Sequence, residues 1–356
     1  MACESGGLNA DDYESARRSD GVMVGTRSGL LLALTVGTCV ACTPRSEWVR
    51  VERSVALMGT IARFVAEAPD RARALESLEQ MVATVEDVEA EISTWRDDSV
   101  LGRLNRQPVG DAMLLPSLSC ELLDRAAHWW READGAFDPA VGRLVEAWGL
   151  RGDGRRPGAD ELDAALLSSG LGEIGLTAEG CSAIRRADVS LDAGAFGKGA
   201  ALDEVRRVMA DVAGAWMADL GGQVAVGPGA WPVALAHPLR RDEPAMELEL
   251  SGGSLATSGG SERDLVLKDG SRVGHVLDPR TGIPVTWRGS VAVWSHSAFD
   301  ADALSTALRV MGLEAGFDWA VDRRIAACFF TVGPDGELMI RATPEFRRRF
   351  RAAKGR

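Results

Sequence analysis

The chain has 356 residues, of which 40 are basic and 52 acidic, giving a formal net charge of −12 at pH 7. This length allows one large domain or two, and a hydrophobic content of 46% is typical of a globular protein with a substantial core. The acidic balance excludes nucleic acid as the main partner, because a phosphate backbone is bound by a basic protein face that displaces its counterions.

The first 43 residues predict an export leader. An apolar run at 29–42 is too short to span a bilayer and ends in small residues, as a secretory signal does. Because the stretch before it is acidic, Met23 is a candidate for the true start. Cys42 is a candidate for the lipid-modified cysteine of a bacterial lipoprotein. We therefore expect an exported protein, in the periplasm or on the outer face of the membrane, attached to it only through a lipid on Cys42.

Three cysteines follow the leader if Cys42 carries a lipid: Cys120, Cys181 and Cys328. Their spacing matches neither a disulfide framework nor a metal site. We expect all three to be buried as small apolar side chains.

Helices are expected first along the mature chain. Apolar residues recur at helical spacing over 75–92, and a second helix is predicted over 117–133, capped by Ser117 or Ser119. The residues between, 95–105, are predicted to be a loop.

A third helix is expected to begin at Asp138, followed by Pro139 at the first helical position. Such a helix start would offer free N–H groups to an anion.

From residue 181 the pattern changes to strands, which continue to about residue 295. Apolar and polar residues alternate between Gly, Pro and Asp turns, which is typical of an antiparallel sheet with one exposed face. Further helices are predicted at 199–213, 299–312 and 314–322. The expected fold class is α+β, with a largely antiparallel sheet packed against helices.

One lysine stands in a Gly-rich stretch, LDAGAFGKGAALDEV at 191–205. The chain has only three lysines, and Lys198 is a compact point charge that suits a phosphate oxygen. The stretch is neither a P-loop, because Asp192 stands where that motif has glycine, nor a dinucleotide fingerprint. The alternative is that Lys198 is an ordinary surface lysine.

Two oxygen-bearing side chains lie four residues apart in the stretch FDADALSTALRVMG at 299–312. Asp302 and Thr306 would project from one face of a helix at adjacent turns. Such a pair can hold Mg²⁺, which takes few protein oxygens and fills its other positions with water and phosphates. The alternative is that Asp302 stabilises the helix start and Thr306 packs.

Eight motifs occur in a fixed order along the chain: MGT at 58–60, ISTWRDDSVLGRLN at 92–105, DGAFDPAVGRLVEAWG at 134–149, the Gly-rich stretch, DLGGQVAVG at 219–227, ATSG at 256–259, HVLDPRTGIPV at 275–285 and DADALSTAL at 300–308. Together they closely resemble the ApbE-type FAD:protein FMN transferases, lipoproteins or periplasmic enzymes that split FAD and attach FMN to a protein threonine or serine. The resemblance covers about 55–345. It implies a single catalytic domain over 44–356, with FAD in a groove between a helical lobe (about 44–180) and a strand-rich lobe (about 181–345).

The resemblance also implies a role for particular residues. The implied FAD contacts are Met58, Trp95, Ala136, Phe137, Asp138, Lys198, Asp219 with Gly221 and Gly222, His275 and Val276. The implied Mg²⁺ ligands are the backbone carbonyl of Ala195 and the side chains of Asp302 and Thr306. The chain departs from the family after ATSG, where Gly260-Ser261-Glu262-Arg263 replaces Asp-Tyr-Glu-Arg, which could alter flavin or acceptor contacts.

The expected reaction is Mg²⁺-dependent transfer of FMN from FAD to a hydroxyl of a partner protein, with release of AMP. Asp302 and His275 are the candidate catalytic residues, the histidine as general base, while His128, His237 and His296 are predicted to be structural. The family's usual acceptors are electron-transport subunits outside the membrane. Two alternatives stay open: an FAD pyrophosphatase that transfers the same phosphorus to water, and a non-catalytic FAD-binding lipoprotein.

Overall fold

The structure is a computed structural model that describes residues 48–177, 181–260, 264–267, 270 and 272–350. These residues belong to one compact unit, Ser46–Arg356. The predicted leader and Cys42 lie outside the described residues. Within the described part of the chain, no helix combines the length and apolar character that a membrane crossing needs.

An eight-stranded sheet organises this unit, in the order β1-β2-β6-β7-β10-β13-β14-β15, with every neighbouring pair antiparallel. Its strands are β1 (Val49–Leu57), β2 (Thr60–Ala68), β6 (Ala215–Leu220), β7 (Val224–Val226), β10 (Gly253–Gly259), β13 (Gly289–Ser295), β14 (Ala326–Val332) and β15 (Leu338–Ala342). The predicted α+β class and the antiparallel sheet are confirmed. The described part of the chain, however, begins with two strands rather than a helix, and β2 pairs with β6 from beyond residue 180.

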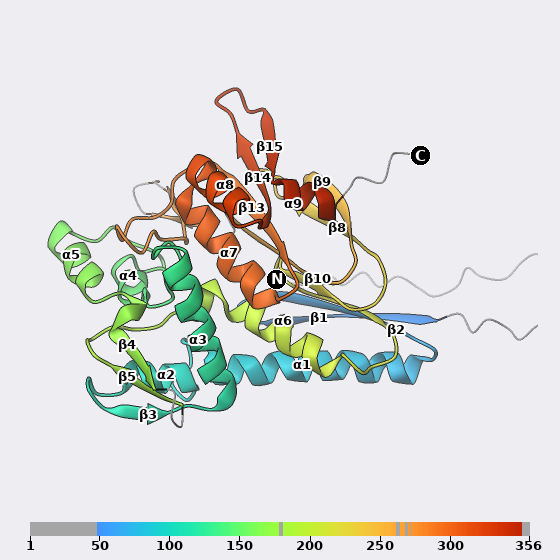
Figure 1. The fold of residues 1–356 in the computed structure, drawn as a ribbon, viewed down its shortest axis with the longest axis horizontal. Helices are drawn as coiled ribbons and strands as arrows, with labels where there is room; N and C mark the ends of the chain where they lie inside the picture. The colour runs from blue at the N-terminus through green and yellow to red at the C-terminus, as the bar shows by residue number, and fades with distance from the viewer. Residues whose placement is uncertain (1–47, 178–180, 261–263, 268–269, 271, 351–356) are drawn as a thin grey trace, which may run out of the picture. The chain divides into compact units, whose positions relative to one another are not determined.

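Helices cover one face of the sheet (Figure 1). α1 (Arg71–Ile92) packs on β1 and β2, while α7 (Ala298–Met311) packs on β10 and β13, and α6 (Gly197–Val208) contacts both helices. Phe64 of β2 is fully buried under this layer, and the next residue, Val65, is fully buried on the opposite face. α8 (Leu313–Asp322) follows α7 and contacts it.

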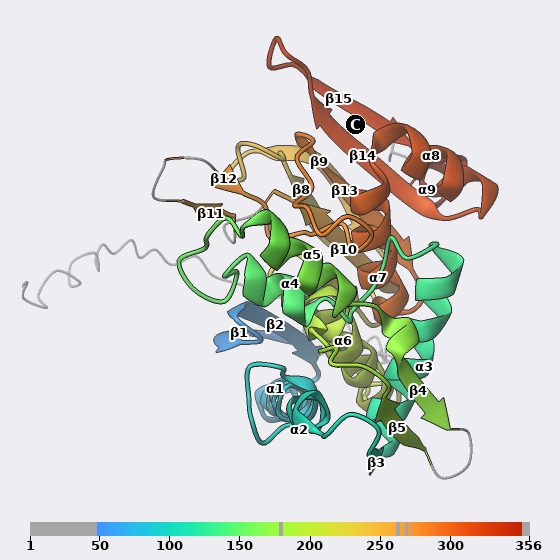
Figure 2. The same cartoon turned by 90° about the vertical axis from the view of Figure 1, so that its left-hand side faces the viewer.

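The opposite face is also covered, so the prediction of one exposed face is wrong. The hairpin of β8 (Trp231–Ala236) and β9 (Pro244–Leu250) and the short helix α9 (Pro344–Arg349) share an apolar cluster with this face. Figure 2 shows the hairpin on the side of the sheet away from α6 and α7. Alternate residues of the central strands are therefore apolar on both sides, which accounts for the nearly continuous apolar run of β14.

The segment between α1 and α6 forms a small separate sheet, β3-β5-β4, surrounded by short helices. Its elements are α2 (Val100–Arg106), β3 (Ala112–Leu114), α3 (Ser117–Glu132), α4 (Gly142–Ala147), α5 (Ala159–Leu167), η1 (Leu171–Glu173), β4 (Ile174–Thr177), β5 (Ser182–Arg185) and η2 (Ala193–Ala195). A two-stranded ladder, β11 (Leu265–Val266) with β12 (Arg272–Val273), lies further along the chain.

Two local predictions fail here because side chains find other partners. Residues 95–105 contain α2, whose N-cap is Ser99 with its hydroxyl accepting the N–H of Gly102 at 2.8 Å. Helix α3 begins after Pro116 without a side-chain cap, because the hydroxyl of Ser119 donates to Glu91 of α1 at 2.6 Å.

Cys120 and Cys181 form a disulfide, contrary to the prediction for these two residues. Their Cα atoms are 6.0 Å apart although 61 residues separate them in sequence. The N–H of Leu115 donates to the carbonyl of Cys181 at 2.9 Å, so the β3–β5 pairing brings the two cysteines together. Cys328 is a free, buried thiol as predicted, and burial raises its pKa to about 12.

Candidate active site

Helices α6 and α7 meet near their N-terminal ends, and each caps the other. Asp302 of α7 accepts the N–H of Gly199 of α6 at 3.0 Å. Asp203 of α6 accepts the N–H groups of Ala298 and Phe299 of α7 at 2.6 and 3.1 Å. The approach requires glycine, because a Cβ at position 199 would lie 2.5 Å from the carbonyl oxygen of Ala298. Two carboxylates on opposite helices therefore hold the Gly-rich turn in place.

Oxygen-bearing side chains gather around Asp302 on α7. Asp302 is 4% exposed, and Thr306 lies one turn later on the same helix, half-buried. The hydroxyl of Ser258 on β10 lies 3.4 Å from that of Thr306 and 2.7 Å from that of Ser305. The short helix η2, which carries Ala195, also contacts α7. The structure thus brings the three predicted metal ligands into one neighbourhood, together with Ser258, which the sequence analysis missed.

This donor set fits Mg²⁺. Carboxylate, hydroxyl and carbonyl oxygens are the ligands that this hard cation prefers. The Asp302 carboxylate accepts the N–H of Gly199 through Oδ2 at 3.0 Å. Among the described residues, no group of three or more His, Cys, Asp or Glu is arranged to hold a metal. An ion here would therefore have one carboxylate ligand and several neutral oxygens.

Lys198 and Asp219 are two further charged residues, and their charges interact. Lys198 is the second residue of α6 and is half-buried, and Asp219 lies near the end of β6. Burial raises the pKa of Asp219. The hydrogen bond from the N–H of Gly222, at 2.8 Å, and the charges of Lys198 and Arg63 act in the opposite direction because they favour the carboxylate. The positive φ of 63° at Gly221 shapes this turn. Arg63 was missed because β2 was not recognised as a strand.

Met58 lies against the start of α6. It occupies the turn between β1 and β2 with φ of 50°, and its N–H donates to Glu89 of α1 at 3.0 Å. A Cβ at Gly197 would lie 3.4 Å from its terminal methyl carbon. The structure therefore places Met58 beside the Gly-rich turn, and its contact with the flavin remains a prediction.

Trp95 presents an open ring near the same turn. The residue is 67% exposed, and the guanidinium of Arg151 lies 5.2 Å from the ring centre. Arg151 also donates to Asp192 at 2.9 Å and to the carbonyl of Thr94 at 3.0 Å. Since Asp192 caps η2, Arg151 connects the Trp95 ring to the segment that carries Ala195. Arg151 was not predicted from the sequence, because its partners are 41 and 57 residues away in the chain.

Residues 136–138 are buried, and the predicted helix start there is wrong. Ala136 and Phe137 are 0% exposed and Asp138 is 7% exposed. Helix α4 begins only at Gly142, because the Asp138 carboxylate accepts the N–H groups of Ala140 at 2.7 Å and Leu171 at 3.0 Å. The predicted helix start at Asp138 is therefore replaced by a turn that Asp138 closes. Contact of these residues with FAD remains a prediction.

Burial also changes the acidity of Asp138. It raises the pKa of this carboxyl to about 6, although the hydrogen bonds from Leu171, Ala140 and Trp130 act in the opposite direction.

His275 is paired with a carboxylate. Its Nδ1 lies 3.0 Å from Oδ1 of Asp264, and its backbone N–H donates to the same oxygen at 3.2 Å. The following residue, Val276, accepts the N–H of Val285 at 2.9 Å and packs against the main core. The other end of this loop is held where the ring N–H of Trp148 donates to the carbonyl of Gly282 at 2.7 Å.

The remaining histidines have structural environments, in agreement with the prediction. His237 is 2% exposed, and its Nδ1 accepts the N–H groups of Leu239 and Arg240, both at 3.1 Å. The rings of His128 and His296 pack edge-on against neighbouring tryptophans.

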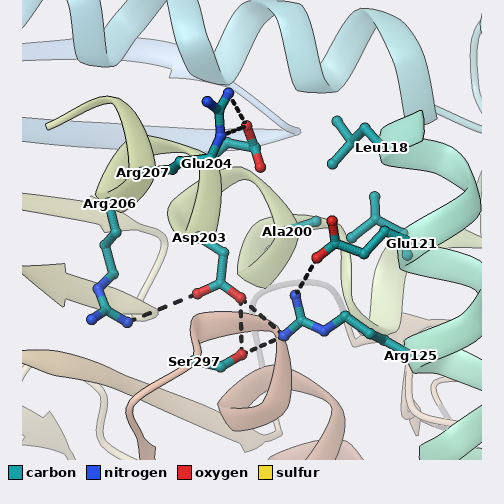
Figure 3. A pocket seen from close by; sticks show the side chains of 10 residues that line it. Leu118, Glu121, Arg125, Ala200, Asp203, Glu204, Arg206, Arg207 and Ser297 are labelled. Carbon is teal, nitrogen blue, oxygen red and sulfur yellow. Dashed lines mark hydrogen bonds and ion pairs between the residues drawn. The ribbon is translucent and has the colours of Figure 1, made fainter. Parts of the chain in front are cut away.

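A charged cluster fixes the other side of the α6–α7 junction (Figure 3). Arg125 of α3 donates to Asp203 at 3.0 Å and to the hydroxyl of Ser297, which itself donates to Asp203 at 2.8 Å. A cavity of about 380 Å³ beside this cluster is lined by Leu118, Glu121, Leu122, Arg125, Ala200, Asp203, Glu204, Arg206, Arg207 and Ser297. None of the predicted site residues lines it.

The described geometry can be compared with known proteins. The model of the ApbE family matches residues 58–330. The chain belongs to the ApbE family. It is 30% identical over 313 residues to the FAD:protein FMN transferase of Treponema pallidum, covering 81% of this chain and 86% of that protein.

Solved structures agree with this family membership. The ApbE protein of Thermotoga maritima superposes with a TM-score of 0.78 at 28% identity, over 85% of this chain and 100% of that chain. The flavinyl transferase ApbE of Pseudomonas stutzeri, in its apo form, gives a TM-score of 0.75 at 25% identity, over 86% of this chain and 98% of that chain. The α+β fold of this chain is thus that of the ApbE structures.

Proposed function

We propose that this ApbE-family chain transfers FMN from FAD to a threonine or serine hydroxyl of a partner protein and releases AMP. The observation that carries the proposal is the junction of α6 and α7. There Asp302 and Thr306 lie beside a glycine-rich helix start that bears Lys198. Carboxylate, hydroxyl and ammonium groups together suit a diphosphate with its metal ion.

The residues of the site divide the work of binding. A bound Mg²⁺ would neutralise charge on the diphosphate as AMP leaves. Asp302, Thr306 and the carbonyl of Ala195 would hold it, and Lys198 would bind a diphosphate oxygen. The exposed ring of Trp95 offers a stacking face to isoalloxazine or adenine.

His275 would accept the proton of the attacking hydroxyl. As the O–H bond breaks, the acceptor oxygen forms a bond to the FMN phosphorus. The bond from that phosphorus to the bridging oxygen breaks, and its electron pair leaves with AMP. Such a positioned base contributes about 10²- to 10⁴-fold to the rate.

The disulfide supports the proposed location. Bonds such as Cys120–Cys181 persist in oxidising compartments and are rare in a reducing cytosol. We therefore place the chain outside the cytoplasmic membrane, where a lipid on Cys42 would keep it near electron-transport subunits as acceptors.

The decisive experiment incubates the mature chain with FAD, Mg²⁺ and a candidate acceptor fragment. AMP is measured by chromatography and the acceptor by intact mass. We expect one AMP for each FMN bound to the acceptor, and loss of both products with EDTA or with Asp302→Ala. The matched control is Asp318→Ala, which removes an exposed carboxylate of α8.

Two other results would replace the proposal. AMP and free FMN without a modified acceptor would show an FAD pyrophosphatase. Intact FAD that stays bound after prolonged incubation would show a flavin-binding protein.

A further inference from the structure

His275 shares one carboxylate oxygen between its ring and its backbone. Oδ1 of Asp264 lies 3.0 Å from Nδ1 of His275 and accepts the backbone N–H of His275 at 3.2 Å. The side chains of His275 and Asp264 are 28% and 21% exposed, so water only partly screens the pair. Because Asp264 holds both the backbone and the ring, it limits the rotation of the imidazole.

A buried cation acts on the same carboxylate. Arg309 of α7 is 4% exposed, and its Nη2 donates to the carbonyl of Trp287 at 2.9 Å, with the Trp287 ring 4.1 Å away. Among the residues that the structure describes, its buried Nε and Nη1 find no hydrogen-bond partner. Burial lowers the pKa of Arg309 to about 10, and the charge of Asp264 opposes that shift. Arg309 therefore remains a cation at neutral pH.

Arg309 also lies on the same face of α7 as the predicted metal ligands. Asp302, Thr306 and Arg309 follow one another at spacings of four and three residues, so they share one face of α7. The helix that presents the predicted metal ligands thus also presents the cation that acts on Asp264.

These contacts decide which ring nitrogen carries the proton. Opposite charges favour each other's ionised form, so the Arg309 cation favours the ionised carboxylate of Asp264. An ionised carboxylate only accepts hydrogen bonds, so Nδ1 of His275 must be the donor. In a neutral imidazole the other nitrogen, Nε2, is then the basic one.

We infer that Asp264 is a positioning residue that holds His275 in the tautomer with the proton on Nδ1, so that Nε2 takes the proton of the attacking hydroxyl. This rests on the proposed function, in which His275 is the base. In the step, the hydroxyl proton passes to Nε2 while the oxygen bonds to the FMN phosphorus and AMP leaves with the bridging oxygen. Asp264 then faces an imidazolium, which it stabilises until the proton passes to water.

A kinetic cycle tests this role in the full mature chain. Asp264→Asn keeps the size of the side chain but removes the charge, and we expect the rate of FMN transfer to fall by about 10- to 10³-fold. FAD affinity, measured by quenching of flavin fluorescence, should change less than about threefold. Asp264→Glu should recover part of the rate. The matched control, Asp242→Asn, makes the same chemical change at an exposed loop position and should have no effect.

The double variant separates positioning from structure. If Asp264 acts through His275, Asp264→Asn should cost nothing further in a His275→Ala background. Equal losses in both backgrounds, or an unchanged rate for Asp264→Asn alone, would overturn the inference.

A second measurement does not depend on activity. The chain has four histidines, so ¹⁵N-histidine NMR with His275→Ala as the assignment variant can resolve the ring. We expect the Nδ1–H tautomer in the unaltered protein and a larger Nε2–H fraction in Asp264→Asn. An unchanged tautomer would overturn the inference even if FMN is transferred. If His275 shows the expected tautomer but the chain transfers no FMN, the interaction of Asp264 with His275 is supported and the proposed function is wrong.

Discussion

Asp203 and Asp302 lie one on each of two crossing helices and have the same local task, yet their surroundings differ. Each accepts a backbone N–H from the start of the opposite helix. Asp203 also receives the guanidinium of Arg125 and the hydroxyl of Ser297. Asp302 shares its helix face with Thr306, next to the hydroxyl of Ser258 on β10.

The same kind of hydrogen bond, from a backbone N–H to a carboxylate, therefore occurs in two different surroundings. At Asp203 the protein supplies the counter-charge itself, and such a carboxylate joins elements together. Asp302 shares its helix face with Thr306, whose hydroxyl lies 3.4 Å from that of Ser258, and neutral oxygens of this kind are ligands that a hard cation accepts. These neighbours fit a structural role for Asp203 and the predicted metal-binding role for Asp302.

The largest expected effect on the reaction comes from removing the charge of Asp302. Asp302→Asn keeps a carbonyl oxygen for the N–H of Gly199, so the contact with the start of α6 should be retained. The charge for the metal is lost, and metal contributions of several kcal/mol correspond to a fall in AMP release of about 10³-fold. Wild-type AMP release in this variant would mean that Asp302 only caps α6.

Replacing Asp203, in contrast, should mainly lower the stability of the fold. Asp203→Ala removes the acceptor of two N–H groups of α7 and one of several acceptors of the Arg125 guanidinium, although Asp203 is 19% exposed. We expect a loss of about 2 to 4 kcal/mol in the free energy of unfolding by urea. Glu121→Ala is the control, because this exposed residue lies 3.8 Å from the same arginine. Equal stability of Asp203→Ala and Glu121→Ala would show that Asp203 does not have the structural role argued for it.

A third buried carboxylate sharpens the comparison through its pH dependence. The pKa of Asp138 is raised by burial to about 6 in the folded chain, above the ordinary value of 3.8. Between these values the folded state binds more protons than the unfolded state, so this group makes the protein less stable as pH rises from 4 to 6.

Asp138→Asn removes this dependence while keeping an acceptor for the N–H groups of Ala140 and Leu171. We expect the variant to gain stability relative to wild type as pH rises from 4 to 7, by on the order of 2 kcal/mol. Urea unfolding at several pH values measures this difference. A constant difference would show that Asp138 titrates normally.

Local patterns were predicted well because their cause is local. Apolar residues three and four apart specify α1, and a spacing of four places Asp302 and Thr306 on one helix face wherever that helix lies. Strand β1 was missed because it is an edge strand whose residues are mostly exposed, so its alternation carries a weak apolar signal.

What the sequence by itself determined is the class of the fold, the main helices, the Gly-rich turn and the pair of metal-ligand candidates, all of which depend on spacings within a few residues. Only the tertiary structure decided that Asp302 caps a helix start 103 residues away, that Asp203 caps another 95 residues away, and that Cys120 bonds to Cys181. It also decided that Asp264 orients His275. These partners meet because sheet pairing and helix crossing bring distant segments together, and no local spacing encodes such a meeting.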